Sequence, residues 1–193
     1  MKKLMIVVSA AIALMVISCE KQQQAPVVES YQAEKAAMIE RGKYLVTAMG
    51  CDDCHSPKRM GPNGVELIQE LRFSGYPSNA PVQEIDKENL DKGWVLFAGD
   101  LTSSVGPWGQ SFSANITSDA TGIGNWSEEN FLTAIRIGKY KGIESGRDLL
   151  PPMPWFAYKN LTDGDLKSIF AFLQTTNPVQ NVVPAPIAPS DLK

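Results

Sequence analysis

Hydrophobic residues recur at helical intervals in three segments of the chain, and side chains spaced three and four apart share one face of a helix. The segments are residues 32–49, 127–138 and 163–174. Helix signals mark their ends. Gly50 follows the first segment, Ser127 and Gly138 bound the second, and Thr162 with Asp165 forms a candidate capping pair before the third. The pattern predicts three helices, each with one buried face.

The stretches between these helices lack a steady period. Residues 60–92 are irregular, whereas the apolar runs 94–97 and 108–112 are separated by glycine and serine. This arrangement favours a short β-hairpin or an irregular flap. Residues 179–193 contain three prolines, which cannot continue a helix, so we expect an extended tail.

The N-terminal segment has the pattern of an export signal. Two lysines precede an uncharged run of about fourteen residues, shorter than the ~20 needed to span a bilayer. Residues 1–18 are therefore predicted to be a signal peptide. The small residues before Cys19 resemble a bacterial lipobox, which implies that Cys19 is lipidated, and an ordinary signal peptide with an incidental cysteine is the alternative. Residues 19–30 are polar and aperiodic, which indicates a flexible tether.

Composition narrows the chemistry. The 193 residues include 44% apolar side chains, enough for the core of one domain. Because 18 Lys and Arg stand against 21 Asp and Glu, the chain lacks the basic stripe that nucleic acid requires, and nucleic acid is excluded as a partner. Only three cysteines and one histidine are present, so every chemical hypothesis must use the same four side chains.

Two of the cysteines and the histidine form a CxxCH run, Cys51 to His55. Thiols three residues apart can reach the two vinyl groups of one porphyrin, and the adjacent imidazole then lies under the iron. We therefore predict one covalent haem c attached to Cys51 and Cys54, with His55 as an axial ligand. Since His55 is the only histidine, this chain cannot supply a second imidazole ligand.

Three other interpretations of the CxxCH run stay open. A structural zinc site needs four ligands, and only a carboxylate could complete it here. A thioredoxin-like site needs a strand before the CxxC pair, whereas the residues before Cys51 look helical. A disulfide between Cys51 and Cys54 would leave His55 without a role.

The sixth iron ligand must then be methionine, lysine, water or nothing. Met49 and Met60 lie within about six residues of His55, too near in sequence to reach the opposite face of a porphyrin readily. Met38 lies on the first predicted helix, where methionine is usually core filler. Met153 stands among three prolines in a stiff, non-helical segment. It is our candidate ligand, with packing under the loop as the alternative.

The order of these features, from helix and CxxCH to a methionine in a proline-rich loop and a final helix, resembles the class I cytochromes c. The resemblance implies an all-α fold of three to five helices around one haem over residues 31–178, with Met153 as distal ligand. It also implies a long irregular insertion, which can contain a short β-hairpin. A closer similarity is to the haem domains in cytochrome subunits of membrane-bound alcohol and sugar dehydrogenases. That similarity rests on Asn115-Ile116-Thr117, residues 121–126, Pro152-Met153-Pro154 and residues 165–173.

The family pattern implies two further roles. Gly42 would lie where the first and last helices cross, so that Phe170 or Leu173 approaches its backbone. The carbonyl oxygen of Pro62, in a Gly-Pro-Asn turn, would accept a hydrogen bond from Nδ1 of His55 and so strengthen its donation to iron.

Four other side chains could touch the haem. Trp126 and Trp155 are candidate hydrogen-bond donors to a buried haem propionate, and ordinary core packing is the alternative for both. Arg136 and Lys139 could pair with propionates or mark a docking face, and simple solvation is their alternative.

Together these features predict an electron carrier rather than an enzyme, tethered by lipid to the bacterial envelope and facing the periplasm. Expected partners are redox proteins: a dehydrogenase, a quinol-oxidising complex or a terminal reductase. Docking should be weak and salt-dependent. The alternatives are a dedicated electron-transfer subunit of a membrane-associated dehydrogenase, and a five-coordinate haem protein that binds gas or turns over peroxide.

Overall fold

A computed structural model describes residues 25–193, so the predicted signal peptide and Cys19 lie outside the described residues. The chain divides into two units, Met1–Ala37 and Met38–Lys193. The packing described below is that of the second unit.

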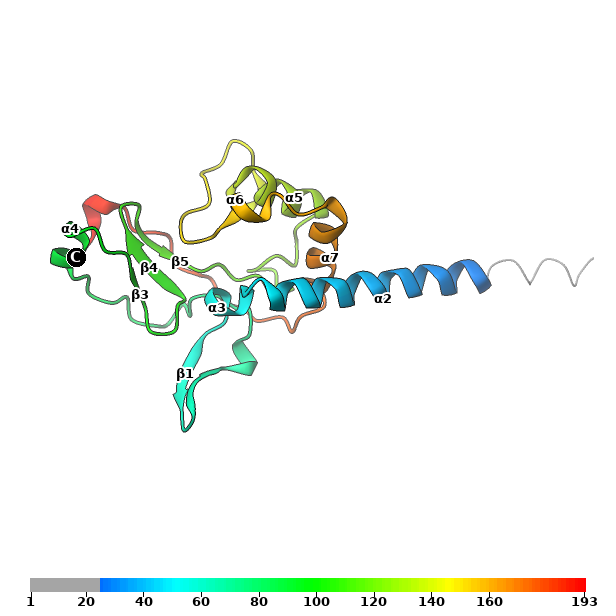
Figure 1. Ribbon diagram of the computed structural model, residues 1–193, viewed down its shortest axis with the longest axis horizontal. Coiled ribbons are helices and arrows are strands. Elements are labelled where there is room, and N and C mark those ends of the chain that lie inside the picture. The colour runs from blue at the N-terminus through cyan, green and yellow to red at the C-terminus, as the bar shows by residue number, and fades with distance from the viewer. Residues whose placement is uncertain (1–24) are drawn as a thin grey trace, which may run out of the picture. The chain divides into compact units, whose positions relative to one another are not determined.

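The helical part of the fold contains α2 (Ala25–Ala48), α3 (Cys51–His55), α5 (Glu128–Ile137), α6 (Trp155–Tyr158) and α7 (Asp163–Leu173) (Figure 1). A short helix, α4 (Lys87–Asp91), and 3-10 turns at Gln69–Leu71, Tyr140–Gly142 and Pro189–Asp191 lie in the connecting regions. The three helices predicted from the apolar pattern are thus confirmed as α2, α5 and α7.

The ends of α5 and α7 form as the sequence predicts. Ser127 accepts a hydrogen bond from the backbone of Asn130, whose side chain accepts one from the backbone of Ser127 in return. Gly138 ends α5 with a left-handed φ of 68°, a conformation that glycine adopts without strain. At the start of α7, Thr162 Oγ1 accepts from the backbone N–H of Asp165 over 3.1 Å. Side chains therefore satisfy part of the unpaired backbone at these helix ends.

The crossing of α2 and α7 at Gly42 is also confirmed. A Cβ atom built on Gly42 would overlap the carbonyl group of Ser168 and lie 2.8 Å from Cβ of Phe172. The residues that approach are therefore Ser168 and Phe172, rather than the predicted Phe170 or Leu173. Only glycine permits this separation between the two helices.

The main hydrophobic cluster lies between α2, α5 and α7. The rings of Phe131 and Phe170 stack with centroids 5.3 Å apart. Each large side chain buried in this way contributes about 1.5–3 kcal/mol. The buried members are Leu45, Val46, Phe73, Ile123, Phe131, Ile135, Leu166, Ile169, Phe170 and Leu173.

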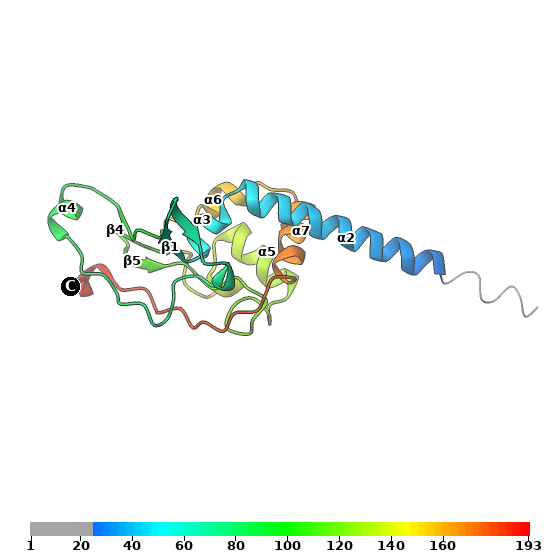
Figure 2. The same ribbon diagram turned by 90° about the horizontal axis from the view of Figure 1, so that it is seen from below.

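The expectation of an all-α fold is wrong, because two small antiparallel sheets lie between α3 and α5. In the first, β1 (Lys58–Gly61) pairs with β2 (Gly64–Leu67). The second has the order β3 (Leu96–Phe97), β4 (Ser103–Gly106), β5 (Gly109–Phe112). Figures 1 and 2 both show α3 between this second sheet on one side and α5, α6 and α7 on the other.

The predicted hairpin is present in altered form. The two apolar runs at 94–97 and 108–112 contain β3 and β5, but these strands are not neighbours. Strand β4 lies between them and pairs with both. Its sequence, Ser-Ser-Val-Gly, has no apolar alternation, which is why the pattern did not indicate a strand there.

The tail 179–193 is mostly extended, as predicted, and it is tied to the rest of the unit. The backbones of Ile187 and Gln110 exchange two hydrogen bonds of 2.9 Å, which add the tail to the edge of β5. The buried amide of Asn181 donates to the carbonyl oxygens of Ser74 and Tyr76. The tail is therefore part of the folded unit Met38–Lys193.

The tether predicted for residues 19–30 is wrong from Ala25 onward, where α2 begins. Pro26 falls in the first turn of this helix, where a missing N–H costs no hydrogen bond, so its presence does not argue for an irregular chain. Across residues 25–193, no helix has both the length and the apolar character to cross a bilayer.

Candidate functional site

The CxxCH run forms α3, which follows α2 after a turn at Gly50. Gly50 has a φ of 67°, in the left-handed region. A Cβ atom there would also lie 2.6 Å from Oδ2 of Asp53. Because α3 spans Cys51–His55, both thiols and the imidazole stand within about one and a half helical turns.

Both thiols of α3 are free and partly buried. Burial raises the pKa of Cys51 to about 12, with the neighbouring Asp52 adding to the effect. Burial likewise raises the pKa of Cys54. A thioredoxin-like site needs a lowered thiol pKa and a preceding strand, whereas these thiols are protonated at neutral pH and follow a helix.

The imidazole of His55 is oriented by a backbone carbonyl. Its Nδ1 lies 2.7 Å from the carbonyl oxygen of Ala114, which can only accept. The proton therefore sits on Nδ1, and Nε2 keeps the lone pair that binds a metal. Burial lowers the pKa of His55, against the opposing effect of this hydrogen bond, and so favours the neutral ring.

The predicted acceptor for His55, the carbonyl of Pro62, is wrong. Pro62 lies in the turn of the β1–β2 hairpin, and the acceptor comes instead from Ala114, 59 residues after His55. Gly75 makes this possible, since a Cβ atom there would lie 2.6 Å from the carbonyl oxygen of Ala114. Tyr76 N also donates to the carbonyl oxygen of Ser113 over 2.9 Å, which holds the two segments side by side.

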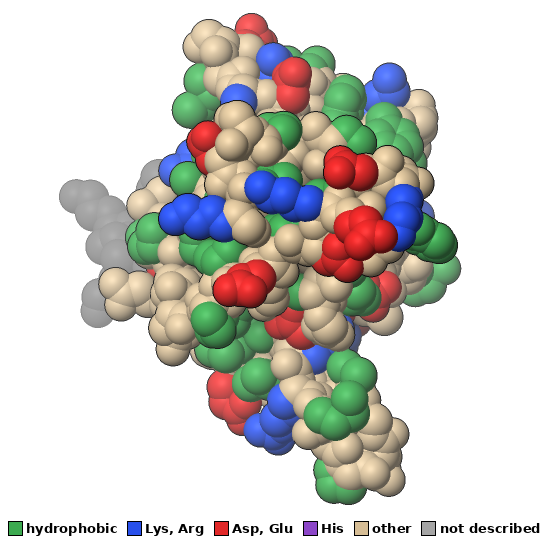
Figure 3. Space-filling model, turned by 90° about the vertical axis from the view of Figure 1, so that its left-hand side faces the viewer, with side chains coloured by type: hydrophobic (Ala, Val, Ile, Leu, Met, Phe, Trp, Pro, Cys, Tyr) green, Lys and Arg blue, Asp and Glu red, His purple; other side chains and the backbone are tan. Residues whose placement is uncertain are grey.

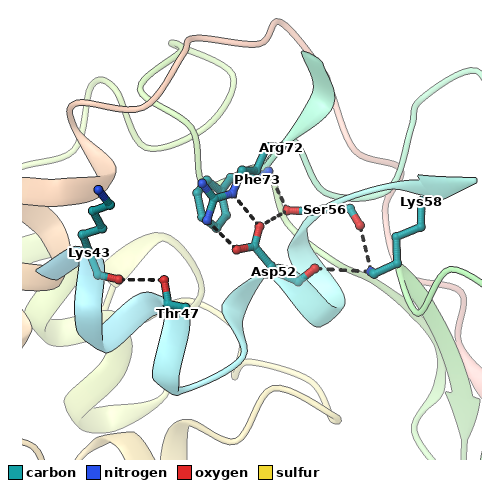
Figure 4. A network of polar contacts seen from close by, with 7 residues as sticks. All are labelled: Lys43, Thr47, Asp52, Ser56, Lys58, Arg72 and Phe73. Carbon is teal, nitrogen blue, oxygen red and sulfur yellow. Dashed lines mark hydrogen bonds and ion pairs between the residues drawn. The ribbon is translucent and has the colours of Figure 1, made fainter. Parts of the chain in front are cut away.

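An ion pair fixes the outer face of α3 (Figure 4). Arg72 donates from Nε and Nη2 to the two carboxylate oxygens of Asp52 over 2.9 and 2.6 Å. Ser56 Oγ donates to Asp52 over 2.7 Å and accepts from the backbone N–H of Phe73. Burial acts to raise the pKa of Asp52, but the hydrogen bonds from Arg72 and Ser56 outweigh it and leave the pKa lowered.

Lys58 caps the C-terminal end of α3. Its Nζ donates to the carbonyl oxygens of Asp53, Ser56 and Asp100 over 2.7, 2.9 and 2.8 Å, with a longer contact of 3.3 Å to that of Asp52. These carbonyls are the ones that the end of a helix leaves without partners. The ammonium group therefore links α3 to the loop before β4.

The loop that carries Met153 packs beside α3. Met153 and Cys51 are both partly buried against the main hydrophobic cluster. In α6, which follows the loop, Tyr158 donates to the carbonyl oxygen of Met49 over 3.0 Å. Burial raises the pKa of Tyr158, and the nearby thiols of Cys51 and Cys54 add to the shift. The structure thus brings the predicted sixth ligand and the CxxCH run to one region of the fold.

The remaining predicted side chains have mainly packing contacts. Trp126 is partly buried against the hydrophobic cluster. The ring of Trp155 lies over Gly138, where a Cβ atom would come 2.6 Å from a ring carbon. Met60 is 78% exposed on β1, a position that leaves it without the packing of a buried ligand.

These residues fit a covalently bound haem. The fit rests on two free thiols and one imidazole in a single short helix, an imidazole that presents Nε2, and a thioether on the same hydrophobic cluster. For the zinc alternative, the described residues 25–193 contain no cluster of three or more Cys, His, Asp or Glu side chains placed to hold a metal.

Three residues at this site were missed from the sequence: Lys58, Arg72 and Ala114. Lys58 lies three residues after the CxxCH run, and a basic residue just past a short helix is a local signal for capping. Arg72 and Ala114 are 20 and 59 residues from their partners, and no local pattern indicates either contact.

No family model matches the chain. It is 32% identical over 138 residues to the fructose dehydrogenase cytochrome subunit of Gluconobacter japonicus, an alignment that covers 71% of this chain and 21% of that protein. It is 32% identical over 137 residues to the gluconate 2-dehydrogenase cytochrome c subunit of Pantoea cypripedii, covering 70% of this chain and 22% of that protein. It is 31% identical over 151 residues to a nicotinate dehydrogenase subunit of Pseudomonas putida, covering 78% and 10%. The chain thus matches less than a quarter of the length of each of these relatives.

Proposed function

We propose that this chain is an electron-transfer cytochrome c that holds a single haem on α3. Cys51 and Cys54 would attach the porphyrin through thioether bonds, and His55 and Met153 would be the axial ligands. The observation that carries the proposal is the 2.7 Å contact from His55 Nδ1 to the carbonyl of Ala114, which presents Nε2 beside two free thiols. Similarity to cytochrome subunits of dehydrogenases supports it.

A bound haem would supply a one-electron iron couple, so the chain makes and breaks no substrate bond. The work of the protein is orientation and exclusion of water. The carbonyl of Ala114 strengthens the donor character of His55, and the hydrophobic cluster against which Met153 packs limits access of water. A thioether opposite an imidazole favours a higher potential than two imidazoles would.

The electron donor is inferred to be a dehydrogenase, and the chain a dedicated electron-transfer subunit rather than a free carrier. Two of the similar proteins are named as cytochrome subunits of fructose and gluconate dehydrogenases, which favours this choice. The face in Figure 3 mixes acidic and basic side chains with scattered apolar ones, without a large field of one sign. Contacts on such a face are expected to be weak and salt-dependent.

Lipidation of Cys19 would keep the protein at a membrane on the periplasmic side of the envelope. Two acyl chains bind a bilayer stably, whereas one binds only marginally. This anchor would raise the local concentration of the chain near membrane-associated dehydrogenases or quinol-oxidising complexes.

The axial assignment is tested by Met153→Ala in the matured holoprotein. The parent is expected to show a low-spin spectrum with a sulfur-to-ferric charge-transfer band. The variant should lose that band and have a lower midpoint potential, because the thioether is gone. Optical spectra and redox titration measure both effects.

Met60→Ala is the matched control, since Met60 is exposed on the β1–β2 hairpin. It should leave the band and the potential unchanged. A Met153→Ala spectrum identical to that of the parent would refute the ligand assignment. A high-spin parent that binds carbon monoxide would instead favour the five-coordinate, gas-binding alternative.

A further inference from the structure

Ser111, on β5, is bonded to the loop that carries Met153. Its Oγ lies 2.6 Å from the carbonyl oxygen of Pro151, two residues before Met153. It also lies 3.0 Å from Oγ of Ser104 and 3.2 Å from Nε1 of Trp108. Ser111 is 8% exposed, so water competes little for these contacts.

Counting protons fixes the direction of each bond. The carbonyl of Pro151 can only accept, so Ser111 donates its single hydroxyl proton there, over the shortest of its contacts. The indole of Trp108 can only donate, and Ser104 must donate as well because the proton of Ser111 is already used. Ser111 Oγ therefore gives one hydrogen bond and accepts two, which saturates it and sets its orientation.

The loop has few hydrogen-bond donors of its own. Three prolines flank Met153, and none has a backbone N–H. Met153 N donates to the carbonyl of Leu150 over a long 3.3 Å, and Trp155 N donates to the carbonyl of Met153 over 2.9 Å. The bond from Ser111 is thus the shortest polar link between the loop and another part of the fold.

The same stretch of chain also holds the other proposed ligand. Ala114, three residues after Ser111, accepts from His55. The stretch is itself fixed, because Gln110 pairs with Ile187 on one side and β4 pairs with β5 on the other. Residues 111–114 are therefore bonded to the carriers of both proposed axial ligands.

We propose that Ser111 is a positioning residue for the sixth iron ligand: its hydroxyl holds the proline-rich loop so that Met153 stays on the iron. This inference rests on the proposed function, in which Met153 is that ligand. Without the hydroxyl, the loop opens more readily and an added ligand displaces the thioether more easily.

The test compares Ser111→Val with Ser111→Thr in the ferric holoprotein. Both substitutions are β-branched and nearly equal in shape, and only threonine keeps a hydroxyl. The measurement is the titration of the charge-transfer band with imidazole, which replaces a methionine ligand. Ser111→Val is expected to bind imidazole roughly fivefold to tenfold more tightly than Ser111→Thr, the factor of one ordinary hydrogen bond. Hydrogen exchange should also be faster at Met153 in the valine variant.

Ser103→Ala is the control, because Ser103 is buried in the same sheet and its hydroxyl bonds to Gln110 rather than to the loop. It should keep the imidazole affinity of the parent. Equal affinities for the valine and threonine variants, or an equal gain in Ser103→Ala, would overturn the role of Ser111. A parent whose band is absent, or survives in Met153→Ala, would mean that the proposed ligand set itself has failed.

Discussion

The helices and the insertion of residues 58–114 hold the candidate site by different kinds of contact. Helices α2, α5 and α7 bury apolar side chains against one another, and this packing places α3 and the Met153 loop against one cluster. The insertion supplies directed polar contacts, from Arg72 to Asp52 and from Ala114 to His55. Because apolar burial is non-directional whereas hydrogen bonds fix orientation, changes in the helices should mainly lower stability. Changes in the insertion should alter the ligand field as well.

The largest expected effect comes from adding one methyl group in each region. Gly42→Ala would force Cβ into the carbonyl of Ser168, and Gly75→Ala would force it into the backbone of Ala114 at a φ of 74°. Each should lower the free energy of unfolding by about 3 kcal/mol. Denaturant titration measures both losses.

The two glycine variants should differ in their spectra. Gly75→Ala displaces the carbonyl that orients His55, so its Soret band and midpoint potential should shift, while those of folded Gly42→Ala should not. Identical spectral changes in the two variants would contradict the division between the helices and the insertion.

The next effect concerns the ion pair on α3. The lowered pKa of Asp52 means that the folded protein gains stability above the ordinary carboxyl value of about 3.9, and loses it as pH falls through the folded value. Asp52→Asn should therefore cost about 1–2 kcal/mol at neutral pH, a figure reduced because Arg72 is 35% exposed. The difference should disappear in acid, as urea titrations across this pH range would show.

Asp53→Asn is the matched control for Asp52→Asn, since Asp53 is its exposed neighbour on α3. It should change stability by less than about 0.5 kcal/mol. A difference between Asp52→Asn and the parent that persists unchanged in acid would show that the charge of Asp52 is not what stabilises α3.

The smallest effect is expected at the N-cap of α7. Thr162→Ala removes the acceptor for the backbone of Asp165 and should cost about 1 kcal/mol, with no change in spectrum or potential. Thr162→Ser should restore most of the loss because it keeps the hydroxyl. A spectral change in Thr162→Ala would mean that the helices also tune the ligands.

The helices were predictable because their signals are local. The spacing of Leu166, Ile169 and Phe170 indicates a buried face within a few residues, and Ser127 and Thr162 mark helix starts in the same way. The CxxCH run is equally local. These short-range patterns were sufficient for α5, α7 and the residues of α3.

The insertion was not predictable because its contacts are long-range. Nothing near Ala114 marks it as the acceptor for His55, and nothing near Ser111 marks it as a donor to Pro151, 40 residues later. Strand β4 lacks apolar alternation, so packing in the folded unit rather than intrinsic pattern decides its state. The error at Pro62 has the same origin, since a familiar turn gave no information on where the chain goes next.

The most direct test of the central claim is mass spectrometry of the peptide that contains Cys51–His55, from protein matured with a haem-attachment system and treated with a thiol-alkylating reagent. The account predicts one haem mass on this peptide and no alkylation of Cys51 or Cys54. A haem-free peptide with both thiols alkylated would contradict it.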